Sequence, residues 1–121
     1  MRLIKFEAEN CAFCVAMEKA QTLERFARTH PDVTIVKLSC ADENGEAPRN
    51  TAYAENAKLS DAYAVEAFPT LVFESDGGGI LAVIPGSCPL SGLEKGYREA
   101  TELLKASTAI AAIAAKATPR G

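Results

Sequence analysis

Two cysteines three positions apart, Cys11 and Cys14, are the residues of this chain best suited to chemistry. They follow a short apolar run and open a helical pattern, so the two sulfurs lie one turn apart on the same side of a helix start. That separation suits a disulfide that forms and breaks. Unpaired N–H groups and the dipole at a helix N-terminus also favour a thiolate over a thiol. The spacing predicts a redox pair, with Cys11 as the exposed nucleophile at the helix start.

Two other interpretations of this pair stay open. A structural metal half-site would need two further ligands, and Cys40, Cys88 and His30 are the only other Cys or His residues. The pair could also be chemically inert. We favour the redox interpretation, in which Cys11 and Cys14 form a redox-active disulfide and neither a metal nor another cofactor takes part.

The composition narrows the class of protein. A chain of 121 residues with 48% hydrophobic content fits one domain with a real core. A formal net charge of −3 and the lack of any Lys/Arg run argue against nucleic-acid binding. No apolar stretch approaches the ~18 residues of a membrane span, and Lys5, Glu7 and Glu9 interrupt any signal-peptide core. We expect a soluble cytoplasmic protein, whose four cysteines are more readily catalytic or buried than a disulfide framework.

The remaining sequence must position the cysteine pair, and its patterns predict seven elements. The expected strands cover residues 1–8, 33–38, 68–73 and 80–84, and the last two form a hairpin around the turn at 75–79. A helix follows the cap residue Asn10 and ends before Pro31, with an apolar face that includes Ala16, Ala20 and Leu23. Further helices are expected at about 51–63 and from Leu93 onward. This order predicts a right-handed βαβ unit followed by a helix, a hairpin and a last helix.

The order of elements, together with two motifs, resembles the thioredoxin superfamily. The motifs are Cys11-Ala12-Phe13-Cys14 and, about 55 positions later, Phe68-Pro69-Thr70 at the start of a strand. The resemblance covers roughly residues 2–106 and implies an α/β fold, a four-stranded mixed sheet flanked by about three helices in the order β-α-β-α-β-β-α. It begins at the strand that leads to the CxxC motif, so the pattern is trimmed at its N-terminal side. We therefore divide the chain into a thioredoxin-like domain, residues 1–106, and an alanine-rich extension, residues 107–121.

Four positions depart from the thioredoxin pattern. Asn10 stands where thioredoxins place a tryptophan, and Ala12-Phe13 replaces the Gly-Pro between the cysteines. Lys5 stands six positions before Cys11, where thioredoxins place an acidic residue. The trimmed pattern is similar to a glutaredoxin, but no basic residue precedes the CxxC motif and the Phe-Pro-Thr-Leu form is that of thioredoxins.

The resemblance also implies roles for residues outside the pair. Pro69 would be a cis-proline beside the cysteines, and Phe68 would present an apolar face and a free backbone edge to an extended substrate. Phe13 would add to the same substrate surface. The plainer alternatives are a strand-start proline and a core phenylalanine.

Lys5, Glu7 and Cys88 are candidate tuning residues. Lys5 on a central strand would be half-buried, with Glu7 two positions along the same face as its partner, unless its stem carries the charge to solvent. Cys88 follows the fourth strand, where the family's loop approaches the site, so it is a candidate for substrate contact or regulation. A merely buried cysteine is the alternative there, and it is the favoured interpretation of Cys40.

These residues predict a thiol–disulfide oxidoreductase of cell redox homeostasis. Its partners would be protein disulfide substrates and an electron donor such as a thioredoxin reductase. The alternatives are a redox-inactive thioredoxin-like module that docks a partner through Phe13 and Phe68, and a glutathione-linked glutaredoxin-type enzyme.

The end of the chain is rich in alanine and suits a helix on propensity alone. We expect the last helix to continue to about Lys116, with its apolar residues Ile110 and Ile113 packed on the domain or against a second copy. Residues 118–121 are expected to be frayed, and a frayed tail throughout is the alternative.

Overall fold

The computed structural model describes residues 1–117 of the chain. The described part of the chain forms four strands and four helices, in the order β1 (Arg2–Glu7), α1 (Ala12–Lys19), α2 (Thr22–Thr29), β2 (Thr34–Ser39), α3 (Ala52–Ala62), β3 (Thr70–Glu74), β4 (Ile80–Pro85) and α4 (Leu90–Ala117). The predicted strands are present, each within two residues of its expected bounds. The frayed end expected at residues 118–121 lies outside the described residues.

The four strands form one mixed sheet in the order β2-β1-β3-β4. β1 pairs with β2 in parallel and with β3 antiparallel, and β3 and β4 form the expected hairpin. β3 is buried along its whole length because it has neighbours on both sides and helices above and below. The sheet therefore brings the end of β1, which precedes Cys11, next to the start of β3, which follows Pro69 (Phe6 pairs with Thr70).

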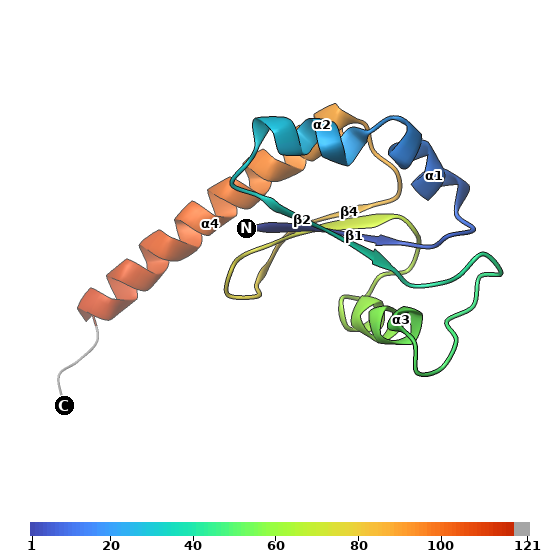
Figure 1. Ribbon diagram of the computed structural model, residues 1–121. Helices are drawn as coiled ribbons and strands as arrows, with labels where there is room; N and C mark the ends of the chain where they lie inside the picture. Colours follow the sequence, from blue (N-terminus) through green and yellow to red (C-terminus); the bar gives the residue numbers. More distant parts are fainter. Residues whose placement is uncertain (118–121) are drawn as a thin grey trace.

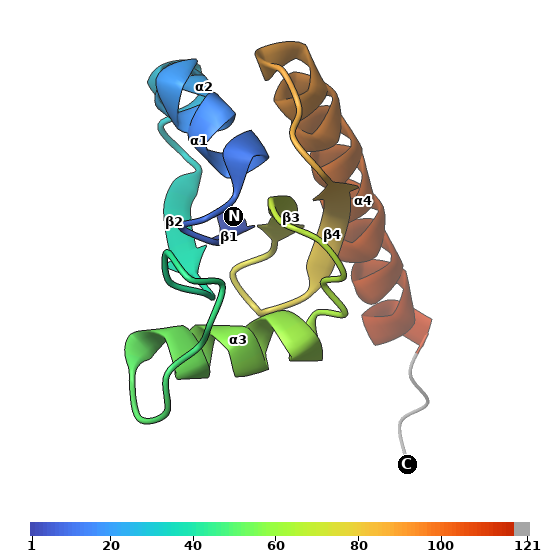
Figure 2. The ribbon, with the colours of Figure 1, turned by 90° about the vertical axis from the view of Figure 1, so that its right-hand side faces the viewer.

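Helices cover both faces of this sheet, so the molecule has three layers (Figures 1 and 2). α1, α2 and α4 lie on one face and α3 lies on the other. The larger core lies under the three helices and is formed by Leu3, Met17, Leu23, Phe26, Val33, Leu71, Phe73, Leu93 and Ala100. The smaller core lies under α3 and is formed by Ile4, Phe6, Cys40 and Val72. Alternate residues of β1 enter opposite cores, which fixes the face from which each side chain acts.

The helix predicted after Cys11 is broken in two, so the structure has four helices rather than about three. The break lies at Gln21, whose φ of 53° is in the left-handed region. Met17 and Phe26 are nine residues apart and would point to opposite sides of an unbroken helix, since a turn holds 3.6 residues. The break lets both side chains enter the same core. The expected apolar face is wrong for the same reason, because Ala16 and Ala20 are exposed whereas Leu23 is buried.

α4 runs along the sheet and then continues past it, as Figure 1 shows. Its first turns are buried at Leu93 and Ala100, and Gly96 lets it approach the sheet so closely that a Cβ there would lie 2.9 Å from Phe73. The helix reaches Ala117, which confirms the expected helical extension. However, Ile110 and Ile113 are 66% and 67% exposed, so the extension does not pack on the domain. No helix in the described residues is both long and apolar enough to span a membrane.

Candidate functional site

Cys11 is the N-cap residue of α1. Its backbone is extended, with φ −92° and ψ 113°, and its Sγ accepts a hydrogen bond from the backbone N–H of Cys14 at 3.2 Å. Side-chain acceptors at an N-cap satisfy helix N–H groups that have no partner within the helix. This sulfur is half-exposed. Cys11 is therefore a half-exposed thiol at the start of a helix.

Cys14 lies one turn further along α1 and faces the core. It is buried and all four cysteines of the chain are free thiols. Burial, and secondarily its hydrogen bond with Cys11, raises the pKa of Cys14 from 9.0 to about 12, while the charge of Lys5 acts in the opposite direction. Cys14 is therefore a protonated thiol at neutral pH, and it is less exposed than Cys11.

The Phe68–Pro69 segment, which directly precedes β3, lies against Cys11. The peptide bond between Phe68 and Pro69 is cis. The Cys11 thiol donates to the carbonyl oxygen of Phe68 at 3.3 Å, across 57 positions of sequence. Pro69 is fully buried, and its carbonyl accepts from the N–H of Gly86 at 2.7 Å. The structure thus brings the two sequence motifs into direct contact at Cys11.

The two phenylalanines of the predicted substrate surface differ in exposure. The Phe13 side chain, in the first turn of α1, is 66% exposed. The Phe68 ring is half-buried and packs on the smaller core beside Val65. The backbone carbonyl of Phe68 therefore contacts Cys11, while its ring packs against the smaller core. Phe13, between the two cysteines in sequence, has an exposed apolar side chain.

Lys5 is buried beneath α1 and its head group is fully partnered. Its side chain is only 1% exposed, so the alternative of a stem that reaches solvent is wrong. Nζ lies 2.8 Å from Oε2 of Glu7 and 3.4 Å from Oε1 of Glu18, and it donates to the carbonyl oxygen of Cys14 at 3.3 Å. A lysine with two carboxylates therefore lies against the backbone of Cys14.

Glu18 is the residue of this cluster that the sequence analysis missed. It contacts Lys5 and also Lys37 of β2, which in turn pairs with Glu24 of α2 at 3.1 Å. Glu18 follows Cys14 by four positions, so it lies on the same side of α1. That spacing, combined with a lysine on the neighbouring strand, was the signal that could have found it.

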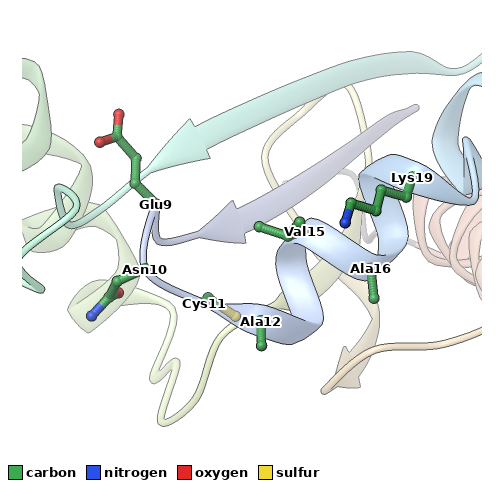
Figure 3. A pocket seen from close by; sticks show the side chains of 7 residues that line it. All are labelled: Glu9, Asn10, Cys11, Ala12, Val15, Ala16 and Lys19. Atoms are coloured by element: carbon green, nitrogen blue, oxygen red, sulfur yellow. The ribbon is translucent and has the colours of Figure 1, made fainter.

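Two open depressions meet at the cysteine pair. The first, of about 400 Å³, is lined by Glu9, Asn10, Cys11, Ala12, Val15, Ala16 and Lys19. Figure 3 shows Cys11 at the start of α1, with Glu9 and Asn10 on the segment before it. The second, of about 230 Å³, is lined by Glu7, Ala8, Glu9, Cys14, Val15, Glu18 and Ser39, and we name it the rear cleft. Solvent therefore reaches Cys11 through the first depression and the region of Cys14 through the rear cleft.

The structure does not bring Cys88 and Cys40 to the pair. Cys88 lines a separate cleft with Met17 and Ala20, at the far end of α1, and burial raises its pKa. Cys40 is buried in the smaller core, where its Sγ contacts the carbonyl oxygens of Leu38 and Asn56, and burial raises its pKa too. Within the described residues no three His, Cys, Asp or Glu side chains are grouped as metal ligands.

Solved structures similar to this chain include thioredoxins and an oxidoreductase. Mitochondrial thioredoxin 3 from Saccharomyces cerevisiae is 28% identical, with a TM-score of 0.60 over 81% of this chain and 76% of its own. Thioredoxin from Fasciola hepatica is 24% identical, with a TM-score of 0.58 over 81% and 79%. A DsbH oxidoreductase is 22% identical, with a TM-score of 0.60 over 84% and 72%. No protein-family model and no curated protein matches the sequence.

The chain has the fold of the thioredoxin superfamily, as the two motifs predicted. That fold is shared by thioredoxins and by thiol–disulfide oxidoreductases.

Proposed function

We propose that this protein is a thiol–disulfide oxidoreductase that reduces or exchanges protein disulfides through Cys11 and Cys14. The observation that carries the proposal is the asymmetry of the pair. Cys11 is half-exposed at a helix start and touches the Phe68 carbonyl, whereas Cys14 is buried and protonated one turn behind it.

The reaction follows from this asymmetry. The Cys11 thiolate attacks one sulfur of a substrate disulfide, whose S–S bond breaks and releases a first thiolate with the electron pair. The Cys14 thiol then loses its proton and attacks Sγ of Cys11, which releases the second substrate thiolate and leaves a Cys11–Cys14 disulfide. The substrate gains two electrons and the pair loses two, and a dithiol donor such as a thioredoxin reductase returns the pair to its reduced form.

The surface around Cys11 suits a protein substrate. An extended segment that reaches the thiol meets the exposed Phe13 on one side and the backbone at Phe68 and Pro69 on the other. Main-chain pairing along such an edge gives affinity with little demand on sequence. We further propose that the protein acts in the cytoplasm and contributes to cell redox homeostasis. Both statements stay predictions.

Trapping the mixed disulfide tests the proposal. Cys14→Ser removes the resolving thiol, so substrates should accumulate as adducts on Cys11 that a reductant releases and that mass spectrometry identifies. Cys11→Ser should form none, and Cys88→Ser is a matched control that should trap nothing while retaining turnover. A clean absence of adducts on Cys14→Ser would count against disulfide exchange and favour a redox-inactive binding module.

The electron donor that supports turnover distinguishes the proposed enzyme from the remaining alternative, a glutathione-linked glutaredoxin-type enzyme. A glutaredoxin-type enzyme would reduce mixed disulfides with glutathione as its donor, whereas the proposed enzyme reduces insulin with thioredoxin reductase. Turnover with glutathione alone would favour the glutathione-linked reading.

A further inference from the structure

The part of α4 that extends past the domain carries a stripe of exposed apolar side chains. Residues 102–116 are exposed, and Leu103, Ile110 and Ile113 are 44%, 66% and 67% exposed. Together with Ala106 these residues follow one another at spacings of three, four and three positions. Such spacing is the a/d pattern of a coiled coil, in which apolar side chains of one helix insert between those of another. The stripe therefore has the pattern that pairs with a second helix.

The domain contacts only the earlier turns of α4. Leu93 and Ala100 belong to the larger core, and Tyr97 packs against it. Figure 1 shows the later turns of α4 leading away from the sheet and from the other helices. A helix of about 15 residues is only marginally stable in water, because most helical stability in proteins comes from packing of an apolar face. A partner helix on the stripe would therefore stabilise this segment.

Two charged residues beside the stripe indicate what that partner is. Glu102 and Lys116 are 14 positions apart, which is two heptads, so both lie on the same flank of the stripe. Suppose that an identical helix lies antiparallel on the stripe, with Leu103 of each chain opposite Ile113 of the other. Glu102 of each chain then lies beside Lys116 of the other, and the two-fold symmetry forms this pair twice. The charges are thus complementary to a second copy of the same segment.

A parallel arrangement of the two copies lacks this complementarity. In parallel coiled coils one flank of each helix faces the opposite flank of its partner. The opposite flank of this stripe carries Ser107 and Ala114, which have no charge. A parallel pair would also place both domains at the same end of the helices, whereas an antiparallel pair separates them, since the domain lies at the N-terminal end of the segment (Figure 1).

We propose that residues 102–116 of α4 form a self-association surface, and that its occupant is the same segment of a second copy in antiparallel orientation. The core of the contact consists of Leu103 against Ile113 and Ala106 against Ile110, each formed twice. Ala106 is small, so the helix axes can approach to the lower end of the usual range of about 8–10 Å. This association is independent of the redox chemistry of Cys11 and Cys14.

A lipid surface fits the segment less well than a second copy does. Helices that lie on membranes have a strongly charged polar face rich in Lys and Arg. Residues 102–116 contain three charged residues, Glu102, Lys105 and Lys116, and Lys105 lies 4.0 Å from Glu102 on the same helix. The face opposite the stripe includes Thr108 and Ala115 and is therefore largely uncharged.

The length of the stripe limits the strength of the dimer. From residue 103 to residue 113 the helix rises by about 15 Å. A contact of this length buries less surface than the roughly 1,200–2,000 Å² of stable complexes, so we expect a dissociation constant roughly between 10 μM and 1 mM. At the micromolar concentrations of a thermal melt the chain is then mostly monomeric, and association adds little to its stability.

Sedimentation equilibrium of the reduced full chain measures the association. In a reductant that excludes intermolecular disulfides, the average mass should rise from that of one chain toward that of two between about 5 μM and 1 mM. Ile110→Glu places a charge in the centre of the contact and should weaken association by at least about tenfold. Ala115→Glu is the matched control, because it places the same charge on the opposite side of the same helix, and it should associate as the wild type does.

Three results of this experiment would overturn the proposal. They are the mass of a single chain at every concentration, a mass above that of two chains, and an equal effect of Ile110→Glu and Ala115→Glu. Both variants should unfold at the wild-type temperature, because their positions are exposed and lie beyond the buried turns of α4. A changed mass can therefore be assigned to the surface and not to a misfolded domain.

Reversal of the flanking charges tests the orientation. Glu102→Lys and Lys116→Glu each place two like-charged pairs in an antiparallel dimer, so each should self-associate about three- to tenfold more weakly than the wild type. An equal mixture of the two variants should regain wild-type association, because every lysine of one variant then meets a glutamate of the other. A mixture no stronger than the separate variants would contradict the antiparallel pairing.

Flotation with vesicles of phosphatidylcholine and phosphatidylglycerol tests the lipid alternative. The wild-type chain should stay in the soluble fraction. Binding to these vesicles that Ile110→Glu abolishes, in a chain that remains monomeric without them, would identify a membrane contact and overturn the proposal.

Discussion

At the scale of single residues, the account depends on the difference between two thiols of one helix. The backbone N–H of Cys14 points at the Cys11 sulfur, whereas the Cys14 sulfur has lost most of its solvent. A thiolate is the reactive form in alkylation and in disulfide exchange. The same difference therefore controls both reactions, and simple alkylation reports on it.

Alkylation of the reduced protein should modify Cys11 first. At pH 7 iodoacetamide should label Cys11 rapidly and the other three cysteines slowly, because burial raises the pKa of Cys14 to about 12 and also raises those of Cys40 and Cys88. Peptide mass mapping over a time course measures the order. Earlier labelling of Cys14, Cys40 or Cys88 would contradict the assignment of Cys11 as nucleophile.

The raised pKa of Cys14 also predicts a loss of stability in alkali. The unfolded chain ionises Cys14 near its ordinary pKa of 9.0, whereas the folded chain retains the proton up to about 12. The reduced folded state therefore binds more protons between these values, and its stability falls as the pH rises through that window. Below pH 9 the contribution is fully present.

Denaturant unfolding of the reduced protein at pH 8 and pH 11 checks this loss. The free energy of unfolding of the wild type should fall by more than that of Cys14→Ala, whose other titrating groups are the same. Equal losses in the two proteins would show that the Cys14 pKa is not raised in the folded state.

Lys5 shows where prediction from the sequence ended at this scale. Its strand position and its partner Glu7 could be derived from the period-two pattern of β1. Its complete burial could not, because burial depends on α1 lying across β1, and so does its contact with Glu18. Pairings within one element follow from spacing, whereas pairings between elements need the packing.

At the scale of elements, the strands and the two motif-bearing loops followed from the sequence. A β-branched run after Pro31 predicted β2, a short apolar run predicted β1, and apolar runs on either side of a polar, glycine-rich turn predicted β3 and β4. The break at Gln21 did not follow, because neither Gly nor Pro marks it and the left-handed conformation is imposed by the need to bury Met17 and Phe26 together.

The extension of α4 followed from alanine propensity, but the expectation that it packs on the domain was wrong, and packing against a second copy stays a prediction. Helix propensity is a local property, whereas a packing surface depends on how far the sheet reaches. Burial along α4 ends at Ala100 and Thr101, and residues 102–116 are exposed.

Deleting residues 108–121 should therefore leave the melting temperature within about 2 °C of the full chain, because exposed positions change stability by less than about 0.5 kcal/mol each. Thermal unfolding followed by circular dichroism measures the effect. Leu93→Ala is the control within the same helix, and it should cost about 2–5 kcal/mol because Leu93 is fully buried. A large loss of stability on deletion would show that the extension packs on the domain or on a second copy.

At the scale of the whole molecule, one junction of the sheet creates the site. The end of β1 leads into Cys11 and the start of β3 follows Pro69, and these strands are neighbours in the sheet. Two motifs about 55 positions apart in sequence thereby meet within hydrogen-bond distance. The layers of helices then decide which thiol is exposed, since α1 presents Cys11 at its start and turns Cys14 toward the core.

Catalysed reduction of insulin tests the central claim most directly. With dithiothreitol as donor, the wild-type protein should accelerate cleavage of the insulin disulfides, seen as turbidity from the released chains. Cys11→Ser should give the uncatalysed rate, and Cys88→Ser should match the wild type. No acceleration by the folded wild-type protein, or full acceleration by Cys11→Ser, would contradict the claim that Cys11 and Cys14 exchange protein disulfides.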